Sequence, residues 1–386
     1  MKLTLRQQLT QFSHILQTQL FPALEEQEGK LDDKARQLIA TLEMIPLARF
    51  VPSSRGWVGR PSKDRLAIAA AFVAKAVYGF SLTRQLLERL HQDGQLRRIC
   101  GWEWPHQVPH ESTFSRAFQE FARMELPQFV HEALIRESQR DRIIGHIARD
   151  STAIEARERF PEEAKQASKR ARLAKKSSGK RGPKRGKRGP HRRWKGGKPQ
   201  PSLASNTRLA RQRSLSLEAM LKELPTHCGI GVKTSSNGYQ QHWRGYKLHL
   251  DVADGQIPIS CILTSASVHD SQVALPLATM TAQRVTNLYD LMDAAYDTQI
   301  IRQHSQSLGH QPIIDYNNRK GSETRVFAPH EAQRFKERTT VERVYARLKD
   351  EFGARSIRVR GAPKVMASLM FGILVLTADE ILRLIS

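Results

Sequence analysis

The sequence predicts an α/β protein in which an all-α N-terminal domain precedes a mixed sheet flanked by helices, with a basic disordered insertion in the second part. Residues 1–140 show repeated helical patterns, whereas later segments alternate strand-like and helical patterns. Between two expected strands, residues 165–213 contain 19 lysines and arginines and no aspartate or glutamate. We therefore predict a helical domain over residues 1–140 and an α/β domain over residues 141–386, with residues 160–215 as the insertion.

The N-terminal part is predicted to contain several short amphipathic helices. Ser62 can cap a helix whose apolar residues extend to Val77, and Ser112 can cap another that carries Phe114. Residues 82–90 form a third amphipathic segment between them. Such helices suit a module that reads DNA, and they suit equally a plain bundle that provides dimer contacts.

The second part is predicted to contain a sheet because several segments alternate apolar and polar residues with period two. Residues 246–252 show this alternation most clearly, and residues 257–263 are an expected partner. A first strand is expected at residues 142–149. Further strands are expected at residues 287–292 and 312–314, and helices at residues 299–306 and 334–352.

The charge of the chain indicates a polyanionic partner. The 386 residues carry a formal net charge of +24, most of it in the insertion, whose glycines and prolines prevent a packed core. Such a segment can neutralise phosphates and release counterions, and the alternative is a solvated tail that only maintains solubility. The residues of this arm expected to contact double-stranded DNA are Lys180, Arg181, Lys184, Arg185, Arg192 and Arg193.

Other features exclude several classes of protein. The three cysteines lie far apart without a Cys-x2-Cys pair, so neither a zinc finger nor a disulfide framework is expected, and His106 and His110 are interpreted as loop histidines. The first residues lack the pattern of a signal peptide. Residues 365–378 are apolar but too short to cross a bilayer, so we expect a buried helix, no membrane and a cytoplasmic, nucleoid-associated location.

One charged strip stands out on the helix predicted over residues 334–352. At about 100° per residue, Arg338, Glu342 and Lys349 lie close together beside an apolar stripe that includes Val344 and Tyr345. This strip can be the wall of an active site. The alternative is an ordinary charged helix face with an i,i+4 ion pair.

The spacing Arg-x3-Glu-x6-Lys resembles the third block of the DDE transposases of bacterial insertion elements, which reads Tyr-x2-Arg-x3-Glu-x6-Lys. Phe335 replaces the tyrosine of that block. Residues 143–152 resemble the strand that delivers the first aspartate, Asp150, and residues 287–297 resemble the second block, with Asp293 as its carboxylate. The three blocks occur in the expected order.

This resemblance implies an RNase H-like core and a catalytic set of Asp150, Asp293 and Glu342. These oxygen ligands suit two Mg²⁺ ions, or Mn²⁺ in their place, which act in phosphodiester cleavage. Arg338 and Lys349 are expected to hold DNA phosphates. Tyr296 is expected either to contact the cut strand or to be a plain core aromatic.

The implied function is a cut-and-paste DNA transposase that binds terminal inverted repeats, cleaves DNA and joins the 3′-hydroxyl ends to target DNA. A homodimer on DNA is expected because two ends must be held together. One alternative is an RNase H-like nuclease or resolvase without integration, and another is a non-catalytic DNA-binding protein.

Several other acidic residues are predicted to have structural roles. Asp270 follows His269 in a loop, where such pairs commonly form local hydrogen bonds or caps. Asp251 and Asp254 flank a turn with Gly255. We therefore leave these residues out of the catalytic set.

Overall fold

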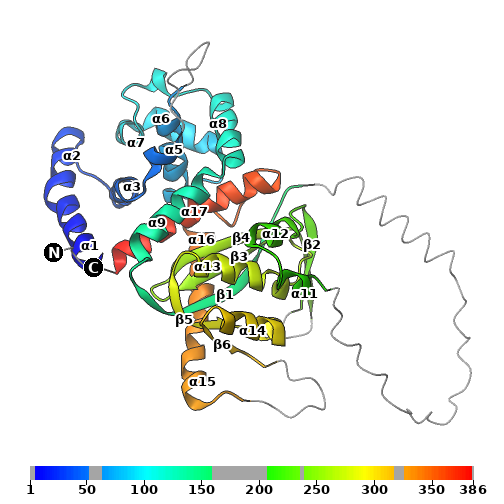
Figure 1. Cartoon of the computed structure of the whole chain (residues 1–386). Coiled ribbons are helices and arrows are strands. Elements are labelled where there is room, and N and C mark those ends of the chain that lie inside the picture. The colour runs from blue at the N-terminus through cyan, green and yellow to red at the C-terminus, as the bar shows by residue number, and fades with distance from the viewer. Residues whose placement is uncertain (1–4, 52–62, 159–206, 235–238, 317–325, 385–386) are drawn as a thin grey trace, which may run out of the picture.

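The computed structural model describes residues 5–51, 63–158, 207–234, 239–316 and 326–384. Its centre is a six-stranded mixed sheet with helices on both faces and a group of helices from the N-terminal part beside it (Figure 1). The α/β class predicted from the sequence is therefore confirmed.

Strand β1 is the central strand of the sheet. It spans Ile143–Glu155 and pairs antiparallel with β3 (Gln240–Ala253) and parallel with β5 (Thr286–Met292). Strand β4 pairs antiparallel with the part of β3 that also pairs with β1, so β4 lies on the other edge of β3. Strand β2 pairs with the first part of β3. Strand β6 extends the sheet parallel to β5. The bounds of these strands are Gly229–Thr234 for β2, Ile257–Ser265 for β4 and Gln311–Ile314 for β6.

Alternate residues of β1 face two different helical layers. Thr152 contacts Lys349 of α16 (Thr340–Asp350). On the opposite face, Arg149 pairs with Asp251 of β3, and Asp251 accepts a hydrogen bond from Thr281 of α13 (Ala274–Ala282). Even-numbered residues of this part of β1 therefore face α16, and odd-numbered residues face α13. The other helices of the α/β part are α11 (Arg208–Gln212), α12 (Leu217–Lys222), α14 (Gln299–Ser307), α15 (Pro329–Phe335) and α17 (Ala362–Arg383).

The N-terminal part is helical, as predicted, but the two helices for which a cap was predicted are capped by other residues. Helix α5 begins after Asp64, whose carboxylate accepts from the backbone N–H groups of the first turn, and Ser62 lies outside the described residues. Helix α8 begins after His110, whose ring accepts from the Ser112 N–H. The helices of this part are α1 (Leu5–Ile15), α2 (Phe21–Glu28), α3 (Asp33–Met44), α4 (Leu47–Phe50), α5 (Arg65–Val77), α6 (Thr83–Gln92), α7 (Gly94–Ile99), α8 (Glu111–Arg123) and α9 (Leu126–Gln139).

Helix α17 joins the two parts of the chain. It lies between the N-terminal helices and the sheet (Figure 1), where it contacts α3, α5, α8 and α9 on one side and β4 and α16 on the other. One hydrophobic cluster consequently extends from Leu38 to Ile381. With 22 residues, α17 is longer than the 14-residue apolar segment in the sequence, and it is long and apolar enough to span a membrane. However, 78 % of its most apolar window is buried inside the protein, which confirms the predicted buried helix.

Two other predictions about elements were wrong. The helix expected over residues 334–352 is interrupted by a 3₁₀ turn, η5 (Lys336–Thr339), which separates α15 from α16. The Thr339 hydroxyl donates to the Lys336 carbonyl at 3.1 Å, an alternative to helical hydrogen bonding that favours this break. The insertion expected to be disordered over residues 160–215 is partly ordered, because its last residues include α11.

Candidate active site

Asp150 and Asp293 lie on two neighbouring parallel strands. The register of β1 and β5 pairs Arg149 with Met292, the last residue of β5. Asp150 and Asp293 follow these two residues, and neighbouring strands are roughly 4.8 Å apart. Asp293 follows a strand end, as predicted. Asp150 does not, because β1 continues to Glu155 through its pairing with β3.

Glu342 reaches this region from α16 and is bound by an arginine. The Arg338 guanidinium donates to Glu342 Oε1 at 2.7 Å, and its other terminal nitrogen lies 3.8 Å from Asp150 Oδ2. The side chain of Glu342 is 53 % exposed. One guanidinium therefore contacts the first and third acidic residues of the predicted set, a geometry that a planar fork permits.

The position of α16 on the sheet is determined by a buried tyrosine. The Tyr345 hydroxyl lies 2.7 Å from the backbone oxygen of Asp150 and 3.1 Å from that of Leu248. Val344 and Leu348 of the same helix are buried in the core. The apolar stripe predicted beside the charged strip is thus confirmed as the face that packs on the sheet.

The environment of the two aspartates disfavours their charged forms. Burial raises the pKa of Asp150 to about 6, and the charge of Asp293 adds to this, whereas the Ser151 N–H and Arg338 oppose it. Burial also raises the pKa of Asp293, and the negative charge of Asp270 contributes. Two carboxylates that repel each other in this way are better accommodated when a cation lies near them.

The donor set suits a divalent cation of the Mg²⁺ class. Asp150, Asp293 and Glu342 provide only carboxylate oxygens, the ligands that hard cations prefer. Within the described ranges, no group of three or more histidine, cysteine, aspartate and glutamate side chains is close enough to hold a metal ion. Glu342 contacts Arg338 instead, and because it is exposed it can change rotamer without disturbing the core.

Lys349, on α16, contacts β1 at Thr152, two residues beyond Asp150. Its ammonium donates to the Thr152 hydroxyl at 2.6 Å. Burial, and then the positive charges of Arg355 and Lys233, lower the pKa of Lys349 below its usual value. Phe335, which replaces the tyrosine of the family block, still places an aromatic ring beneath the Arg338 guanidinium, whose central carbon lies 5.8 Å from the ring centre.

Tyr296 is a core residue in this structure. It is 1 % exposed and packs in a hydrophobic cluster with Met292 and Ile300. Its hydroxyl has no hydrogen-bond partner among the described residues. Burial raises its pKa well above the usual value, with further contributions from Asp270, Asp150 and Asp293. The position favours the core-aromatic interpretation over stacking on DNA.

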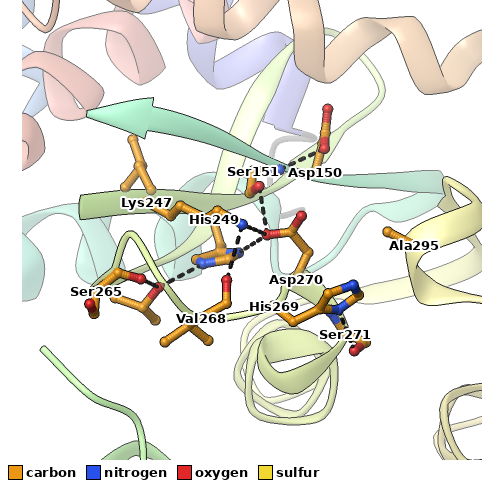
Figure 2. A network of polar contacts seen from close by, with 12 residues as sticks. Asp150, Ser151, Lys247, His249, Ser265, Val268, His269, Asp270, Ser271 and Ala295 are labelled. Atoms are coloured by element: carbon orange, nitrogen blue, oxygen red, sulfur yellow. Dashed lines mark hydrogen bonds and ion pairs between the residues drawn. The ribbon is translucent and has the colours of Figure 1, made fainter. Parts of the chain in front are cut away.

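A polar network that the sequence did not predict lies beneath Asp150. The Asp270 carboxylate accepts from the Ser151 hydroxyl at 2.8 Å and from the Lys247 ammonium at 3.0 Å, and His249 Nδ1 is 4.0 Å away (Figure 2). The predicted local cap is made by His269, whose ring accepts from the Ser271 N–H. The only signal for the network was the period-two alternation of β3, which places Lys247 and His249 on one face.

Asp251 also has a role other than the one predicted. It is fully buried in β3 and forms a bidentate ion pair with Arg149, with both distances at 2.7 Å. Asp254 does lie in the turn, where it accepts from the Gly145 N–H at 3.3 Å and pairs with Arg142. The predicted arm contacts, Lys180, Arg181, Lys184, Arg185, Arg192 and Arg193, lie outside the described residues.

Two family models match the chain. Residues 221–378 match the model described as "Transposase DDE domain", and residues 23–120 match the one described as "Transposase domain (DUF772)". The first segment contains Asp293, Glu342 and Lys349, and begins beyond Asp150 and the basic insertion. The second covers most of the N-terminal helices. No curated protein matches the chain.

Proposed function

Since this chain is a DDE transposase with an RNase H-like catalytic domain, we propose that it catalyses cut-and-paste transposition. It binds the terminal inverted repeats of its element, cleaves the DNA there and joins the 3′-hydroxyl ends to target DNA. The observation that best supports this proposal is the placement of Asp150 and Asp293 on adjacent parallel strands, with Glu342 of α16 linked to Asp150 through Arg338.

The three carboxylates are the proposed metal ligands. DDE transposase domains use divalent metal ions, and we assign two Mg²⁺ ions, replaceable by Mn²⁺, to Asp150, Asp293 and Glu342. When bound, such ions stabilise the attacking and leaving oxygens of phosphodiester cleavage. The protein positions these ligands by the register of β1 and β5 and by the contact of Tyr345 with the backbone of Asp150.

The cationic residues near this site are proposed to hold DNA. Arg338 is placed to exchange one carboxylate contact for a phosphate oxygen, because a guanidinium matches both groups. Lys349 provides a second phosphate contact on the same face of β1. Tyr296 acts from the core by supporting the segment after Asp293. The arm residues Lys180, Arg181, Lys184, Arg185, Arg192 and Arg193 add salt-dependent attraction to duplex DNA.

The working assembly is proposed to be a homodimer on DNA, because both ends of an element must be cut and joined together. Its substrates are DNA molecules, so we place it in the cytoplasm with the nucleoid. A related nuclease or resolvase on the same core would cleave without joining ends to a target. A non-catalytic DNA-binding protein would have no use for carboxylates placed on adjacent strands and a facing helix.

The direct test uses DNA that carries the inverted repeats flanking the gene. Purified full-length protein is incubated with this DNA, Mg²⁺ or Mn²⁺, and a supercoiled target plasmid. The proposal predicts cleavage at the repeat ends and joining of 3′-hydroxyl ends to the plasmid. Cleavage without joining would support the nuclease alternative, and the absence of cleavage with both metals would contradict the proposed activity.

A further inference from the structure

Asp270 is a mostly buried carboxylate immediately below the candidate active site. It begins the 3₁₀ turn η3 (Asp270–Val273), which leads into α13. It lies on the face of β1 opposite Asp150, because Ser151, which contacts it, follows Asp150 along the strand (Figure 2). Neither the proposed metal site nor the proposed DNA contacts include this carboxylate.

The environment of Asp270 keeps it ionised. Burial alone would raise the pKa of Asp270, but the positive charge of Lys247 and the hydrogen bonds from Lys247 and the Ser151 hydroxyl hold it below the usual value. Lys247 also donates to the backbone oxygen of Val268 at 3.0 Å, so the segment before Asp270 is held at the same point. An ionised carboxylate can only accept hydrogen bonds. The Ser151 hydroxyl must therefore donate to it, which restricts the orientation of Ser151.

Ser151 is in contact with both carboxylates. Its side-chain hydroxyl donates to Asp270 Oδ1 at 2.8 Å, and its backbone N–H donates to Asp150 Oδ1 at 2.7 Å. The two contacts are on opposite faces of β1, and they share one residue. We propose that Asp270 is a positioning residue that, through Ser151, holds the Asp150 carboxylate in the orientation needed for metal binding.

A purely local role for Asp270 does not account for these contacts. Capping of η3 is performed by His269, whose Nδ1 accepts from the Ser271 N–H at 3.4 Å and lies 2.8 Å from the Ser271 hydroxyl. The buried His249 imidazole, which burial keeps neutral by lowering its pKa to about 4, is bound on its other side by Thr264 at 2.9 Å. Partners that orient a metal ligand from outside the metal site commonly affect metal affinity by about 10-fold to 100-fold when removed.

The inference rests on the proposed function, and its test measures metal binding separately from cleavage. The variants are Asp270→Ala, Asp270→Asn, Ser151→Ala and the double variant Asp270→Ala/Ser151→Ala. Binding of Mn²⁺ to the full-length protein is followed by electron paramagnetic resonance, and cleavage is followed in a single turnover on bound DNA. Thermal unfolding and DNA affinity verify that each variant is folded. Glu218→Gln is the matched acid-to-amide control, because Glu218 is 79 % exposed on α12.

We expect Asp270→Ala and Ser151→Ala each to weaken Mn²⁺ binding about tenfold without a change in DNA affinity. Asp270→Asn should retain part of the binding, because its amide oxygen can still accept from Ser151. The double variant should bind Mn²⁺ no more weakly than Asp270→Ala, because the effects of two substitutions that act through the same contact do not add.

Wild-type Mn²⁺ affinity in both Asp270→Ala and Ser151→Ala would overturn the inference. A loss of Mn²⁺ affinity in the double variant equal to the product of the two single losses would also overturn it. Ser151→Ala removes only a hydroxyl, so it decides the question even if Asp270→Ala does not fold. A wild-type protein that neither binds Mn²⁺ nor cleaves DNA would contradict the proposed function itself, an outcome distinct from the failure of these variants.

Discussion

The Tyr345 hydroxyl lies 2.7 Å from the backbone oxygen of Asp150. This contact joins the helix that carries Glu342 to the strand that carries Asp150, across 195 positions of the sequence. The distance between these two acidic residues is therefore set partly by a hydroxyl group that takes no part in the chemistry.

Tyr345→Phe removes this hydroxyl and keeps the ring. The backbone oxygens of Asp150 and Leu248 then lose a buried donor, and we expect the free energy of unfolding to fall by about 1–2 kcal/mol. Cleavage should also slow, because α16 is less firmly held. Urea denaturation measures the first effect. Tyr239→Phe is the control, since Tyr239 is 76 % exposed, and equal stability of the two variants would contradict the assigned role.

Asp150 should make folding less favourable at neutral pH when no metal is present. Its pKa is raised to about 6 in the folded protein, above the value of about 3.9 in an unfolded chain, so the folded state gains a proton first as the pH falls. The unfavourable contribution is therefore present above about pH 6 and disappears as the pH falls toward about pH 4.

Asp150→Asn should consequently raise the free energy of unfolding by about 3 kcal/mol at about pH 8 and by much less at about pH 4. The amide can still accept from the Ser151 N–H. Urea denaturation in the presence of a chelator at the two pH values measures this difference. A gain that is the same at both pH values would show that charge on Asp150 is not its cause.

Arg338→Lys should slow cleavage by about tenfold, a loss typical of residues that orient metal ligands. An ammonium cannot contact Glu342 and Asp150 together as the guanidinium does at 2.7 and 3.8 Å. Single-turnover cleavage rates test this expectation, with DNA affinity measured in parallel. The control is Arg343→Lys, at an exposed position of α16, the helix that follows η5, and a wild-type rate in Arg338→Lys would contradict the bridging role.

The elements that carry the three acidic residues could be predicted because each shows a local pattern, whereas the choice of these residues came from the resemblance. Asp293 follows a short strand, and Glu342 lies beside an apolar stripe with helical spacing, so both elements were visible in the sequence. Their placement around Asp150 depends on strand register between segments far apart in the chain, which no local pattern specifies. The resemblance to a known family provided that information.

The unpredicted elements had weak or misleading local signals. Strand β2 contains Gly229 and Gly231, which reduce its strand character, and Gly231 leaves room for the ring of Trp243. Helix α13 is buried on most sides and contains Pro276 in its first turn, so it shows no amphipathic period. Asp270 resembled a capping residue because the sequence does not show that Ser151 and Lys247, which lie on two strands far from it in the chain, donate hydrogen bonds to its carboxylate.

Arg347 links α16 to the C-terminal helix. It pairs with Glu351 of its own segment and with Asp379 of α17 at 2.7 Å, and it also contacts the buried Glu380. Arg347→Ala leaves Glu380 without this partner, so the free energy of unfolding should fall by about 3 kcal/mol. Thermal or urea unfolding measures the change. Arg343→Ala on the exposed face of α16 should change stability by less than about 0.5 kcal/mol, and similar values for the two would contradict the assigned role of Arg347.

The central claim is that Asp150, Asp293 and Glu342 form one metal-dependent site for DNA cleavage, and Glu342→Gln tests it most directly. Glutamine preserves the shape of the side chain and can still accept from Arg338, but it lacks the charge that a metal ligand needs. Glu337→Gln, on the neighbouring turn, is the matched control. Cleavage of DNA with the flanking inverted repeats is measured with Mg²⁺ and Mn²⁺, alongside DNA affinity. The account predicts that Glu342→Gln binds this DNA as the wild type does and does not cleave it, whereas cleavage at the wild-type rate would contradict the site.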